Sequence, residues 1–542
     1  MRERSFTEWV AYAIDKGHND QKAVALFLRG QGLKFSAARL RETWRSVWSS
    51  EGVNNVLPLS PATPEDLPEP VKPLVGGRLK SPEAYRPSLA GQRFVFTCAQ
   101  NNTEVHPLFW ETLQTICKHK DAQLGVAKIS YNKGGWQKHG GTTKNKSIGL
   151  EDEGLWYDPK IVPFEIFQQV MVTDGLVFCG ELDILPTAIY PLNGLDNYTG
   201  PHSAIVPHVK MQMQSFATMK HEPAKLLYTT GACTLRNYIQ RRSGQIAEYN
   251  HVYGAVYVEV DNDGDWFVRQ LNADDEGIVF DLETAYGPGW VSETKAFGSP
   301  LVTLGDIHVE KLDEVAWQGA REMLRHLDPS HVFIEDLIDF EPRNHHNKKD
   351  PWFLAHQNKY GLSVRGGMLM GWDFMNALGQ QFPNAKIISV RSNHDQAIGR
   401  WLKDAPELGD PNTEYWHYLN YNAYKAIREQ GSFDAFGFAI ADVGPTLSNV
   451  RYLKEDESFI LRGIEHGMHG HLGPNGSRGN PKAFRQIGRR ANTGHTHSAG
   501  IIDGIYTAGV LATLDMGYNN GPSSWSQSSI VTYPNGKRTI IT

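Results

Sequence analysis

The sequence predicts a mixed α/β protein, and two observations carry this prediction. From about residue 300 onward, short apolar segments alternate with longer amphipathic ones, which is typical of strands joined by crossover helices. Several of the apolar segments end in carboxylate, imidazole or amide side chains. Because ligands gather at the carboxyl ends of strands in such sheets, the same region is expected to hold a functional site.

Length and composition limit the class of protein. The chain has 542 residues, of which 40% are hydrophobic and 21% charged, and its net charge is −6. These values exclude a wholly disordered or collagen-like chain and give no overall attraction to nucleic acid. The four cysteines form no CxxC pair, and there is no run of about 18 apolar residues. We therefore expect a cytoplasmic protein without a membrane-spanning segment.

The first 90 residues predict a helical domain followed by a linker. Residues 1–50 contain two segments with apolar residues three and four apart, separated by the turn "GQGLKF", and this pattern is typical of a helix-turn-helix. The second segment presents Arg39, Arg41 and Arg45 as candidates for DNA contacts, although a small helical bundle used for packing or assembly explains the pattern equally well. Residues 51–90 repeat proline too often for a helix and predict an extended linker.

Residues 91–297 predict an α/β domain of unknown role. The segments "RFVFTCAQ" and "AQLGVAKIS" have the pattern of strands, and "HPLFWETLQTICKH" between them has that of a helix. Farther on, "HVYGAVYVEV" and "DWFVRQLNA" flank the turn residues "DNDG" and predict a hairpin. The basic segment "YNKGGWQKHGG" lacks P-loop spacing, so it indicates phosphate binding only weakly.

Residues 298–542 hold the motifs that carry chemistry. The strands "PLVTLGD", "HVFIED" and "AKIISVRSNHD" alternate with the helical segments "VEKLDEVAWQGAREMLRHL" and "GGMLMGWDFMNALGQQF". The polar residues that follow these strands, or lie in later histidine-rich loops, are Asp306, His308, Asp336, Asp339, Asn393, His394, Asp395, His466, His469, His471, His495 and His497. Mixed oxygen and nitrogen ligands suit Mn²⁺, Fe²⁺ or Zn²⁺, and an aspartate between two cations can bridge them at about 3.5–4 Å.

In this order, the motifs D-x-H, D-x-x-D, N-H-D, H and G-H-x-H resemble those of the calcineurin-like metallophosphoesterase family. The resemblance implies a β-sandwich flanked by helices over residues 298–542. It also implies a two-metal centre that holds Mn²⁺, with Mg²⁺ or Fe²⁺ as alternatives. The ligands that it implies are Asp306, His308 and His497 for the first ion, Asp336 as the bridge, and Asn393, His469 and His495 for the second ion, with His466 as the alternative to His469.

The resemblance implies reactive residues as well. His394 would be the general acid near the leaving oxygen, with Asp395 beside it to orient or polarise its ring. The sequence departs from the family at two positions, because Glu335 and Ser392 stand where the family usually has glycine, before the bridging aspartate and before the asparagine. Neither position supplies a family ligand, so the departures put the geometry of the two turns in question rather than the metals.

Basic residues close to these motifs favour DNA as the substrate, because cationic side chains neutralise backbone phosphates. The residues are Arg343, His345 and His346 after Asp339, and Arg478, Lys482, Arg485, Arg489 and Arg490 between two ligand motifs. The segments "GPNGSRG", "GHTHSAGIIDGIYTAG", "GPSSW" and "YPNGKRT" resemble phage-encoded metallophosphoesterases. Among these are the pre-early DNA-degrading, first-step DNA-transfer proteins of T5-like phages, which are related in type to SbcD-like nucleases.

This second resemblance implies a DNase that degrades host DNA early in infection, in the cytoplasm of the host cell. It also implies a homo-oligomer, with a second phage DNA-transfer protein as a further candidate partner. Two alternatives stay open: a metal-dependent phosphatase or cyclic-nucleotide phosphodiesterase, and a DNA-transfer or assembly protein in which the metal site is secondary.

Overall fold

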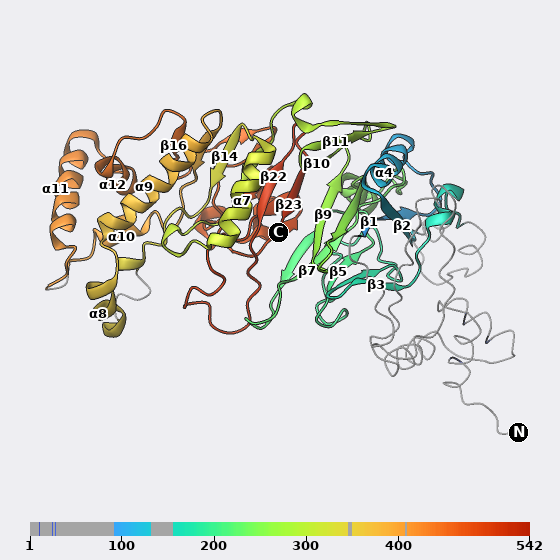
Figure 1. Ribbon diagram of the computed structural model, residues 1–542, viewed down its shortest axis with the longest axis horizontal. Helices are drawn as coiled ribbons and strands as arrows, with labels where there is room; N and C mark the ends of the chain where they lie inside the picture. Colours follow the sequence, from blue (N-terminus) through green and yellow to red (C-terminus); the bar gives the residue numbers. More distant parts are fainter. Residues whose placement is uncertain are drawn as a thin grey trace, which may run out of the picture. The chain divides into compact units, whose positions relative to one another are not determined.

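The computed structural model describes residues 92–131, 155–344, 350–406 and 409–542, together with Val10, Val24 and Leu28. Several predictions lie outside the described residues: the helix-turn-helix with Arg39, Arg41 and Arg45, the linker of residues 51–90, most of "YNKGGWQKHGG", and the pair His345 and His346. The described chain is mixed α/β, with several sheets and helices (Figure 1). Among its helices, none is long and apolar enough to span a membrane.

The chain forms two compact units. The first comprises Met1–Met213, Lys225–Val279 and Tyr286–Val291, and the second comprises Gln214–Ala224, Phe280–Ala285 and Ser292–Thr542. The boundary expected from the sequence lay between residues 297 and 298. The structure instead assigns two short segments from the middle of the chain, and residues 292–297, to the second unit.

The first unit contains a four-stranded sheet with the order β2-β1-β8-β9. Its strands are β1 (Arg93–Gln100), β2 (Ala122–Ile129), β8 (Gly254–Val260) and β9 (Trp266–Asn272). β1 is parallel to β2 and antiparallel to β8. The predicted hairpin is confirmed, because β8 and β9 pair directly across the "DNDG" turn, with Val260 opposite Trp266.

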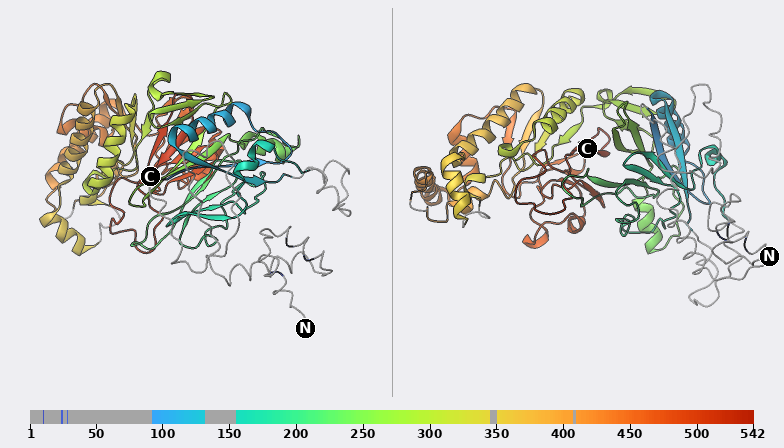
Figure 2. Two further views of the ribbon diagram at one scale, coloured as in Figure 1. Left: turned by 45° about the vertical axis from the view of Figure 1, so that its right-hand side comes forward. Right: turned by 60° about the horizontal axis from the view of Figure 1, so that its bottom comes forward.

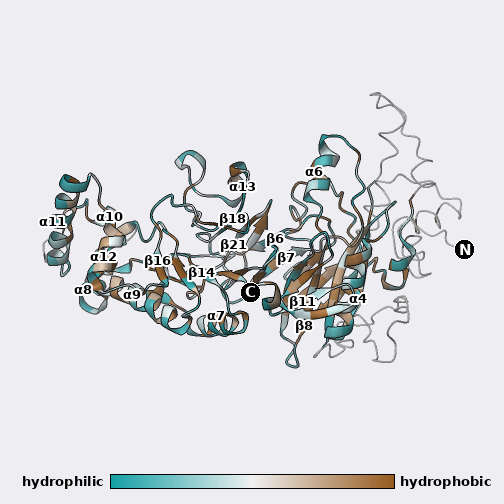
Figure 3. Ribbon diagram, turned by 90° about the horizontal axis from the view of Figure 1, so that it is seen from above, coloured by the Kyte–Doolittle hydropathy of each residue, from teal (hydrophilic) through white to brown (hydrophobic). Residues whose placement is uncertain are grey.

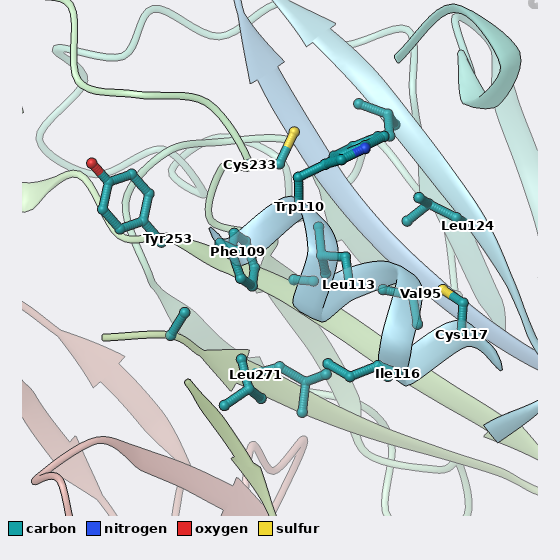
Figure 4. Packing of buried hydrophobic residues seen from close by; sticks show 14 of the residues in the cluster. Val95, Phe109, Trp110, Leu113, Ile116, Cys117, Leu124, Cys233, Tyr253 and Leu271 are labelled. Atoms are coloured by element: carbon teal, nitrogen blue, oxygen red, sulfur yellow. The ribbon is translucent and has the colours of Figure 1, made fainter. Parts of the chain in front are cut away.

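Helix α4 (Pro107–Lys120) covers one face of this sheet (Figure 4). The ring of His106 accepts a hydrogen bond from the backbone N–H of Phe109, so the helix begins with one of its free amides satisfied. Phe109, Leu113 and Ile116 recur at helical spacing and pack in one cluster with Val95 of β1 and Leu271 of β9. The remaining elements of this unit are η3 (Pro159–Phe164), β3 (Gln169–Thr173), β4 (Leu176–Cys179), β5 (Ser203–Val206), β7 (Lys225–Thr229) and α6 (Arg242–Asn250).

The second unit contains a six-stranded sheet with the order β16-β15-β14-β13-β22-β23. Its strands are β13 (Leu301–Thr303), β14 (His331–Ile334), β15 (Lys386–Ser389), β16 (Val450–Tyr452), β22 (Ser529–Thr532) and β23 (Arg538–Ile541). β13, β14, β15 and β16 are parallel neighbours. The crossover helices are α7 (Glu314–Leu327) and α9 (Val364–Gln381), so the strand and helix order predicted for residues 300–390 is confirmed.

Helix α7 begins later than the sequence pattern suggested. The predicted segment started at Val309, but residues Val309–Lys311 form a separate 3-10 turn, η5. The carboxylate of Asp313 accepts hydrogen bonds from the amides of Val315 and Ala316, both at 3.0 Å, and this cap sets the start of the helix. In Figure 3, α7 is largely hydrophilic while the neighbouring β14 is hydrophobic, as expected for an outer helix and a central strand.

A second group of strands in this unit packs against the six-stranded sheet. Its order is β17-β18-β19-β21-β20-β6, with β17 (Ile460–Leu461), β18 (Ile464–Glu465), β19 (Arg490–Thr493), β21 (Ile505–Thr507), β20 (Gly500–Ile502) and β6 (Met213–Phe216). The ring of Phe333 on β14 stacks on His466, with centroids 4.4 Å apart. The side-chain amide of Asn492 on β19 donates to the hydroxyl of Thr303 on β13 at 3.2 Å. The two groups of strands therefore share a core.

The helices after β15 lie together in one group, visible in Figures 1 and 2. They are α10 (Ala397–Trp401), α11 (Thr413–Gln430) and α12 (Ala435–Val443), beside α9, and α8 (Pro351–Tyr360) precedes α9 in the chain. The remaining short elements between residues 279 and 487 are β10 (Val279–Asp281), β11 (Thr284–Gly287), β12 (Trp290–Glu293), η4 (Thr294–Phe297), η6 (Glu341–Arg343), η7 (Pro474–Gly476), α13 (Pro481–Phe484) and η8 (Arg485–Ile487).

Two segments from the middle of the chain complete the second unit. In the segment that follows β6, Thr218 and Ser523 exchange backbone hydrogen bonds of 3.0 and 2.8 Å, and the hydroxyl of Ser215 on β6 donates to the carbonyl of Ala499 at 2.7 Å. In the other segment, the ring of Phe280 stacks on Tyr533, with centroids 5.7 Å apart. Both segments are thus integral to the packing around β20 and β23.

Candidate metal centre

The candidate ligands converge because of how their strands are arranged. The parallel strands β13, β14 and β15 place their carboxyl ends at one edge of the sheet. The loops after β18 and β19, in the other group of strands, supply three further histidines, His469, His495 and His497. The residues at this edge are Asp306 and His308 after β13, Asp336 and Asp339 after β14, Asn393 and His394 after β15, His469 after β18, and His495 and His497 after β19.

Four of these residues have left-handed backbone conformations. The angle φ is 43° at His308, 40° at Asp336, 72° at His495 and 55° at His497. Non-glycine residues rarely adopt positive φ, and each instance costs on the order of 1–3 kcal/mol. Hydrogen bonds hold the strained turns in place: the amide of His308 donates to the carbonyl of Asp336 at 2.7 Å, and the amide of His495 donates to the carboxylate of Asp306 at 2.8 Å. Strain concentrated in one place is typical of a functional site.

The first group of potential ligands is Asp306, His308, Asp336 and His497, all buried, with ligand atoms that lie within 4.8 Å of one another. The Nε2 atoms of His308 and His497 lie 3.0 Å apart, and Nε2 of His497 lies 3.1 Å from a carboxylate oxygen of Asp306. This is the complete set that the sequence assigned to the first ion together with the bridging aspartate.

The second group is Asp336, His469 and His495, again with ligand atoms within 4.8 Å of one another. Nε2 of His469 lies 3.3 Å from a carboxylate oxygen of Asp336. The side-chain oxygen of Asn393, the fourth residue that the sequence assigned to the second ion, is buried and has no hydrogen-bond partner among the described residues. Asp336 belongs to both of these groups.

The unsatisfied polar atoms at this edge fit a cation site. One carboxylate oxygen of Asp306, one of Asp336, and Nδ1 of His497 are also buried without a hydrogen-bond partner in the described part of the chain. A buried acceptor left unpaired costs about 1–3 kcal/mol, so several together are costly unless something binds them. Carboxylate oxygens and imidazole nitrogens are ligands for Mn²⁺, Fe²⁺ and Zn²⁺, so these residues could hold one or more metal ions.

The electrostatics of the cluster differ among its histidines: burial keeps two of them neutral, whereas at His469 burial is outweighed by Asp336 and Glu335, which raise its pKa well above the ordinary value. Burial lowers the pKa of His495 to about 3 and that of His497 to about 4, so both imidazoles are neutral near pH 7. Burial also raises the pKa of Asp306 to about 7, although His469 acts in the opposite direction. Burial acts likewise on Asp336, but the neighbouring His469 and His394 outweigh it and hold the pKa of this carboxyl well below its usual range.

Glu335 has a role that the sequence did not reveal. Its side chain is fully buried, and its carboxylate lies 2.9 Å from Nδ1 of His469. A carboxylate can only accept, so Nδ1 carries the proton and Nε2 of His469 is the nitrogen that faces Asp336. Glu335 therefore orients a candidate ligand. The second departure, Ser392, keeps its turn without glycine, because its hydroxyl accepts from the amide of Asp395 at 3.1 Å and its own amide donates to the carboxylate of Asp395 at 3.2 Å.

The structure separates the two candidate histidines before the GHTH motif. His469 lies in the cluster, whereas His466 stacks on Phe333 in the core and its Nδ1 faces the side chain of Asn492 at 3.4 Å. Burial lowers the pKa of His466 to about 3. His466 is therefore a neutral core histidine, and His469 is the residue placed to bind a metal.

His394 lies beside the cluster, with its ring partly accessible. Its Nδ1 is 2.9 Å from the carbonyl oxygen of Asp339 and 3.5 Å from a carboxylate oxygen of the same residue. Burial opposes the charged ring, but Asp336 and Asp339 outweigh it and raise the pKa of His394. The expectation that Asp395 orients this ring is corrected: the carboxylate of Asp395 turns back to the amide of Ser392, and Asp339 is the residue that holds the ring.

A comparison with curated proteins identifies a relative. Over 470 residues the chain is 40% identical to Protein A1 of Escherichia phage T5, a match that covers 83% of this chain and 82% of that protein. The chain belongs to the Protein A1 family. No protein-family profile and no solved structure gives a significant match.

In this A1-family protein, the basic residues between the ligand motifs lie on the surface. Arg478, Lys482, Arg489 and Arg490 are exposed, and Arg485 is half exposed beside Asp503, with 3.6 Å between guanidinium and carboxylate. Arg343 is different, because its guanidinium is largely buried in an ion pair with Asp410, where Nε donates at 2.7 Å. A phosphate contact at Arg343 would have to compete with that pair, whereas contacts at the four exposed residues stay a prediction.

The A1-family site has two further features that the sequence analysis missed. The indole of Trp525 packs edge-on against the ring of His497, with centroids 4.2 Å apart, and so limits its orientation. A cleft of about 530 Å³ opens beside His469 and His471 and extends to Arg489. Its other wall includes the acidic residues Glu455, Asp456 and Glu457. Trp525 ends the motif "GPSSW", but that motif does not reveal the contact with His497, and the acidic segment lies outside the motifs of the sequence analysis.

Proposed function

We propose that this A1-family protein is a two-metal phosphodiesterase of the calcineurin-like type. The observation that carries the proposal is that the buried Asp336 belongs to two groups of candidate ligands, one with Asp306, His308 and His497 and the other with His469 and His495. When held by these residues, two divalent cations would supply an activated hydroxide and offset charge on the phosphoryl oxygens. Mn²⁺ suits the mixed carboxylate, imidazole and amide set, with Mg²⁺ or Fe²⁺ as alternatives.

The chain's own residues would provide orientation and a proton. Because a carbonyl oxygen accepts only, the contact with Asp339 fixes the proton of His394 on Nδ1 and leaves Nε2 to carry the second, transferable proton. The raised pKa of His394 favours the protonated ring. A protonated imidazole can give its proton to the departing oxygen, which is general acid catalysis. Glu335 and Trp525 would keep His469 and His497 in their ligand orientations.

We propose DNA as the substrate. Arg478, Lys482, Arg489 and Arg490 are exposed in the segment between His469 and His495, so cationic side chains lie close in the chain to two candidate ligands. Such side chains neutralise backbone phosphates irrespective of base sequence. In a relative of a phage protein, a DNase that degrades host DNA early in infection is the activity that best joins this surface to the ligand cluster.

One observation favours a second candidate. The cleft beside His469 and His471 has a volume within the range of small-ligand pockets, about 300–1,000 Å³, and its acidic wall would repel a polyanion. A phosphatase or a cyclic-nucleotide phosphodiesterase would use such a cleft for a small phosphoester. A DNA-transfer or assembly role, with the metal site secondary, is the third reading.

The deciding experiment incubates the purified protein with supercoiled and linear DNA in the presence of Mn²⁺, Mg²⁺ or EDTA. We expect cleavage with Mn²⁺, none with EDTA, and a loss of at least about 10³-fold in Asp336→Asn, since a bridging ligand contributes several kcal/mol of transition-state stabilisation. Asp373→Asn is the matched control, because Asp373 is exposed on α9 and should leave the rate unchanged.

Other outcomes would select among the alternatives. Hydrolysis of p-nitrophenyl phosphate without cleavage of either DNA form would favour the phosphatase. Undiminished DNA cleavage by Asp336→Asn would favour the reading in which the metal site is secondary. No hydrolysis of any phosphoester with any of the metals would contradict the proposal itself.

A further inference from the structure

Helix α8, at the lower edge of the helix group in Figure 1, presents a stripe of aromatic rings to solvent. Trp352, His356 and Tyr360 follow one another at intervals of four residues, so they fall within about 80° of one another around the helix axis. All three are exposed, with exposed fractions of 86% for Trp352 and 67% for Tyr360. Gln357, on the inner side of the helix, is buried. Exposed rings gathered in one stripe, rather than scattered singly, indicate a binding surface.

The stripe is held in a defined orientation. The carboxylate of Asp350 accepts hydrogen bonds from the backbone amides of Trp352 and Phe353, at 2.9 and 3.2 Å, and so caps the start of α8. Near the other end of the helix, the side-chain oxygen of Asn358 accepts from the guanidinium of Arg343 at 2.9 Å. None of the three rings takes part in these bonds, so the bonds fix the helix and leave its rings available.

The bond to Arg343 places α8 close to the candidate metal centre. Arg343 comes four positions after Asp339, the residue whose carbonyl oxygen contacts the ring of His394. Four residues span at most about 14 Å, so the point at which α8 is anchored lies within that distance of Asp339. A strand of DNA that reaches His394 can therefore continue along α8.

The rings of the stripe suit unpaired bases. Four residues of helix rise about 6 Å, so neighbouring rings are about 6 Å apart along the axis, whereas the bases of a duplex are stacked at about 3.4 Å and cover one another's faces. An exposed ring can stack only on a base that is unpaired or that ends a duplex. Stacking of this kind tolerates any base sequence, because every base has an aromatic face.

Charge on the helix favours a polyanion over a protein partner. None of the ten residues of α8, all described, is Asp or Glu, and Lys359 lies at the edge of the stripe. Its ammonium group is 4.8 Å from the centroid of the Tyr360 ring, close enough to neutralise the phosphate of a nucleotide whose base stacks there. No exposed residue of α8 is Leu, Ile, Val or Met, whereas the centre of a protein interface is typically apolar.

We propose that the stripe formed by Trp352, His356 and Tyr360 binds single-stranded DNA by stacking unpaired bases on its rings. The inference deepens the proposed function, because it rests on DNA as the substrate and names the form of DNA that the site receives. The stripe holds the strand beside the metal centre, and Lys359 contacts its backbone. A single strand or a frayed end should therefore be bound more tightly than the interior of a duplex.

The test measures binding to the full chain by fluorescence anisotropy in EDTA, where metal-dependent cleavage is suppressed. The probes are a labelled single-stranded oligonucleotide, the same sequence as a closed hairpin duplex, and a strand of equal length in which every base is absent. The original protein should bind the normal strand at least about tenfold more tightly than either of the other two probes, because stacking contributes to each base that it engages.

The variants separate the rings from the charge. Trp352→Ala and Tyr360→Ala should each raise the dissociation constant for the normal strand by about fivefold to 100-fold and leave that for the base-free strand unchanged, which also shows that the variants fold. Trp352→Phe keeps a ring and should stay within about threefold of the original. Lys359→Gln should weaken binding to both strands. Tyr249→Ala is the matched control, because Tyr249 on α6 is 86% exposed, as Trp352 is, and lies in the other unit.

The outcomes distinguish this inference from the proposed function. Equal binding of the strand and the hairpin duplex would overturn the inference, as would alanine variants that bind the strand as tightly as the original protein does. The second result is also the one expected if the stripe meets a protein partner instead. A protein that binds single-stranded DNA through Trp352 but hydrolyses no phosphoester would contradict the proposed function and leave the stripe's role intact.

Discussion

Glu335→Gly replaces the carboxylate behind His469 with the residue that the calcineurin-like resemblance leads one to expect there. In the structure this carboxylate is fully buried and accepts from Nδ1 of His469 at 2.9 Å. Burial raises the pKa of Glu335 to about 7, although the hydrogen bond from His469 acts in the opposite direction. Removing the side chain leaves a buried N–H without its partner and frees the ring to rotate.

The expected effect on metal binding follows from that geometry. Loss of a residue that orients a metal ligand typically costs 10–100-fold in affinity, which corresponds to about 1.4–2.7 kcal/mol. Because His469 belongs to the second ligand group and not to the first, one Mn²⁺ should bind about as before and the other should weaken. Glu335→Gln keeps an acceptor oxygen but no charge, so its loss should be smaller.

Isothermal titration with Mn²⁺, together with electron paramagnetic resonance of the loaded protein, measures both quantities. The original protein should show a spin-coupled pair, and Glu335→Gly should show the spectrum of a single ion at Mn²⁺ concentrations that fill only the tighter site. Glu322→Gln is the matched control, because Glu322 is exposed on α7. Thermal unfolding in EDTA establishes that the glycine variant folds. Two tight Mn²⁺ sites in Glu335→Gly would refute the reasoning.

Three further predictions concern catalysis, packing and pH. His394→Gln should slow DNA cleavage by about 10²-fold or more but should slow hydrolysis of a p-nitrophenyl phosphoester less, because that leaving group needs no proton. Equal losses of rate on the two substrates would contradict the role of His394 as the general acid. Gly494→Ala should lower the Mn²⁺ content of the purified protein, since a Cβ there would overlap the carboxylate of Asp306, whereas Gly319→Ala on α7 has open space and serves as control. Burial lowers the pKa of His251 to about 3, so its neutral form contributes stability above pH 6.5 that is lost as the pH falls toward 3. Between pH 7 and pH 5, the free energy of unfolding measured with urea should fall by about 2 kcal/mol, and this fall should be absent in His251→Gln.

The sequence could predict that several candidate ligands lie close together because they directly follow strands. Asp306, Asp336 and Asn393 come within a few residues of β13, β14 and β15, and parallel strands bring their ends to one edge whatever the details of the packing. The order of strands and helices from residue 300 to 390 followed from periodicity for the same reason. These parts of the prediction depend on short-range patterns.

The features of the site that the sequence did not predict depend on contacts between residues far apart in the chain or on details of local turns, which no periodic pattern contains. Glu335 and His469 are 134 residues apart, and only the packing of the two groups of strands brings them together. Adjacency in the chain favoured Asp395 as the partner of His394. The carboxylate of Asp395 instead accepts a hydrogen bond from the amide of Ser392, and the residue that contacts the His394 ring is Asp339, which follows a different strand.

The assignment of residues 214–224 and 280–285 to the second unit has a consequence for any attempt to isolate that unit. A fragment that begins at residue 298 would lack the strand that lies beside β20 and the phenylalanine that stacks on Tyr533. An unpaired strand edge and an uncovered aromatic surface are hazards for aggregation. During synthesis, those two segments leave the ribosome long before the strands that they join, so the second unit cannot close until the chain is nearly complete. The metal centre is therefore not a detachable module, and its assembly waits for the last strands of the protein.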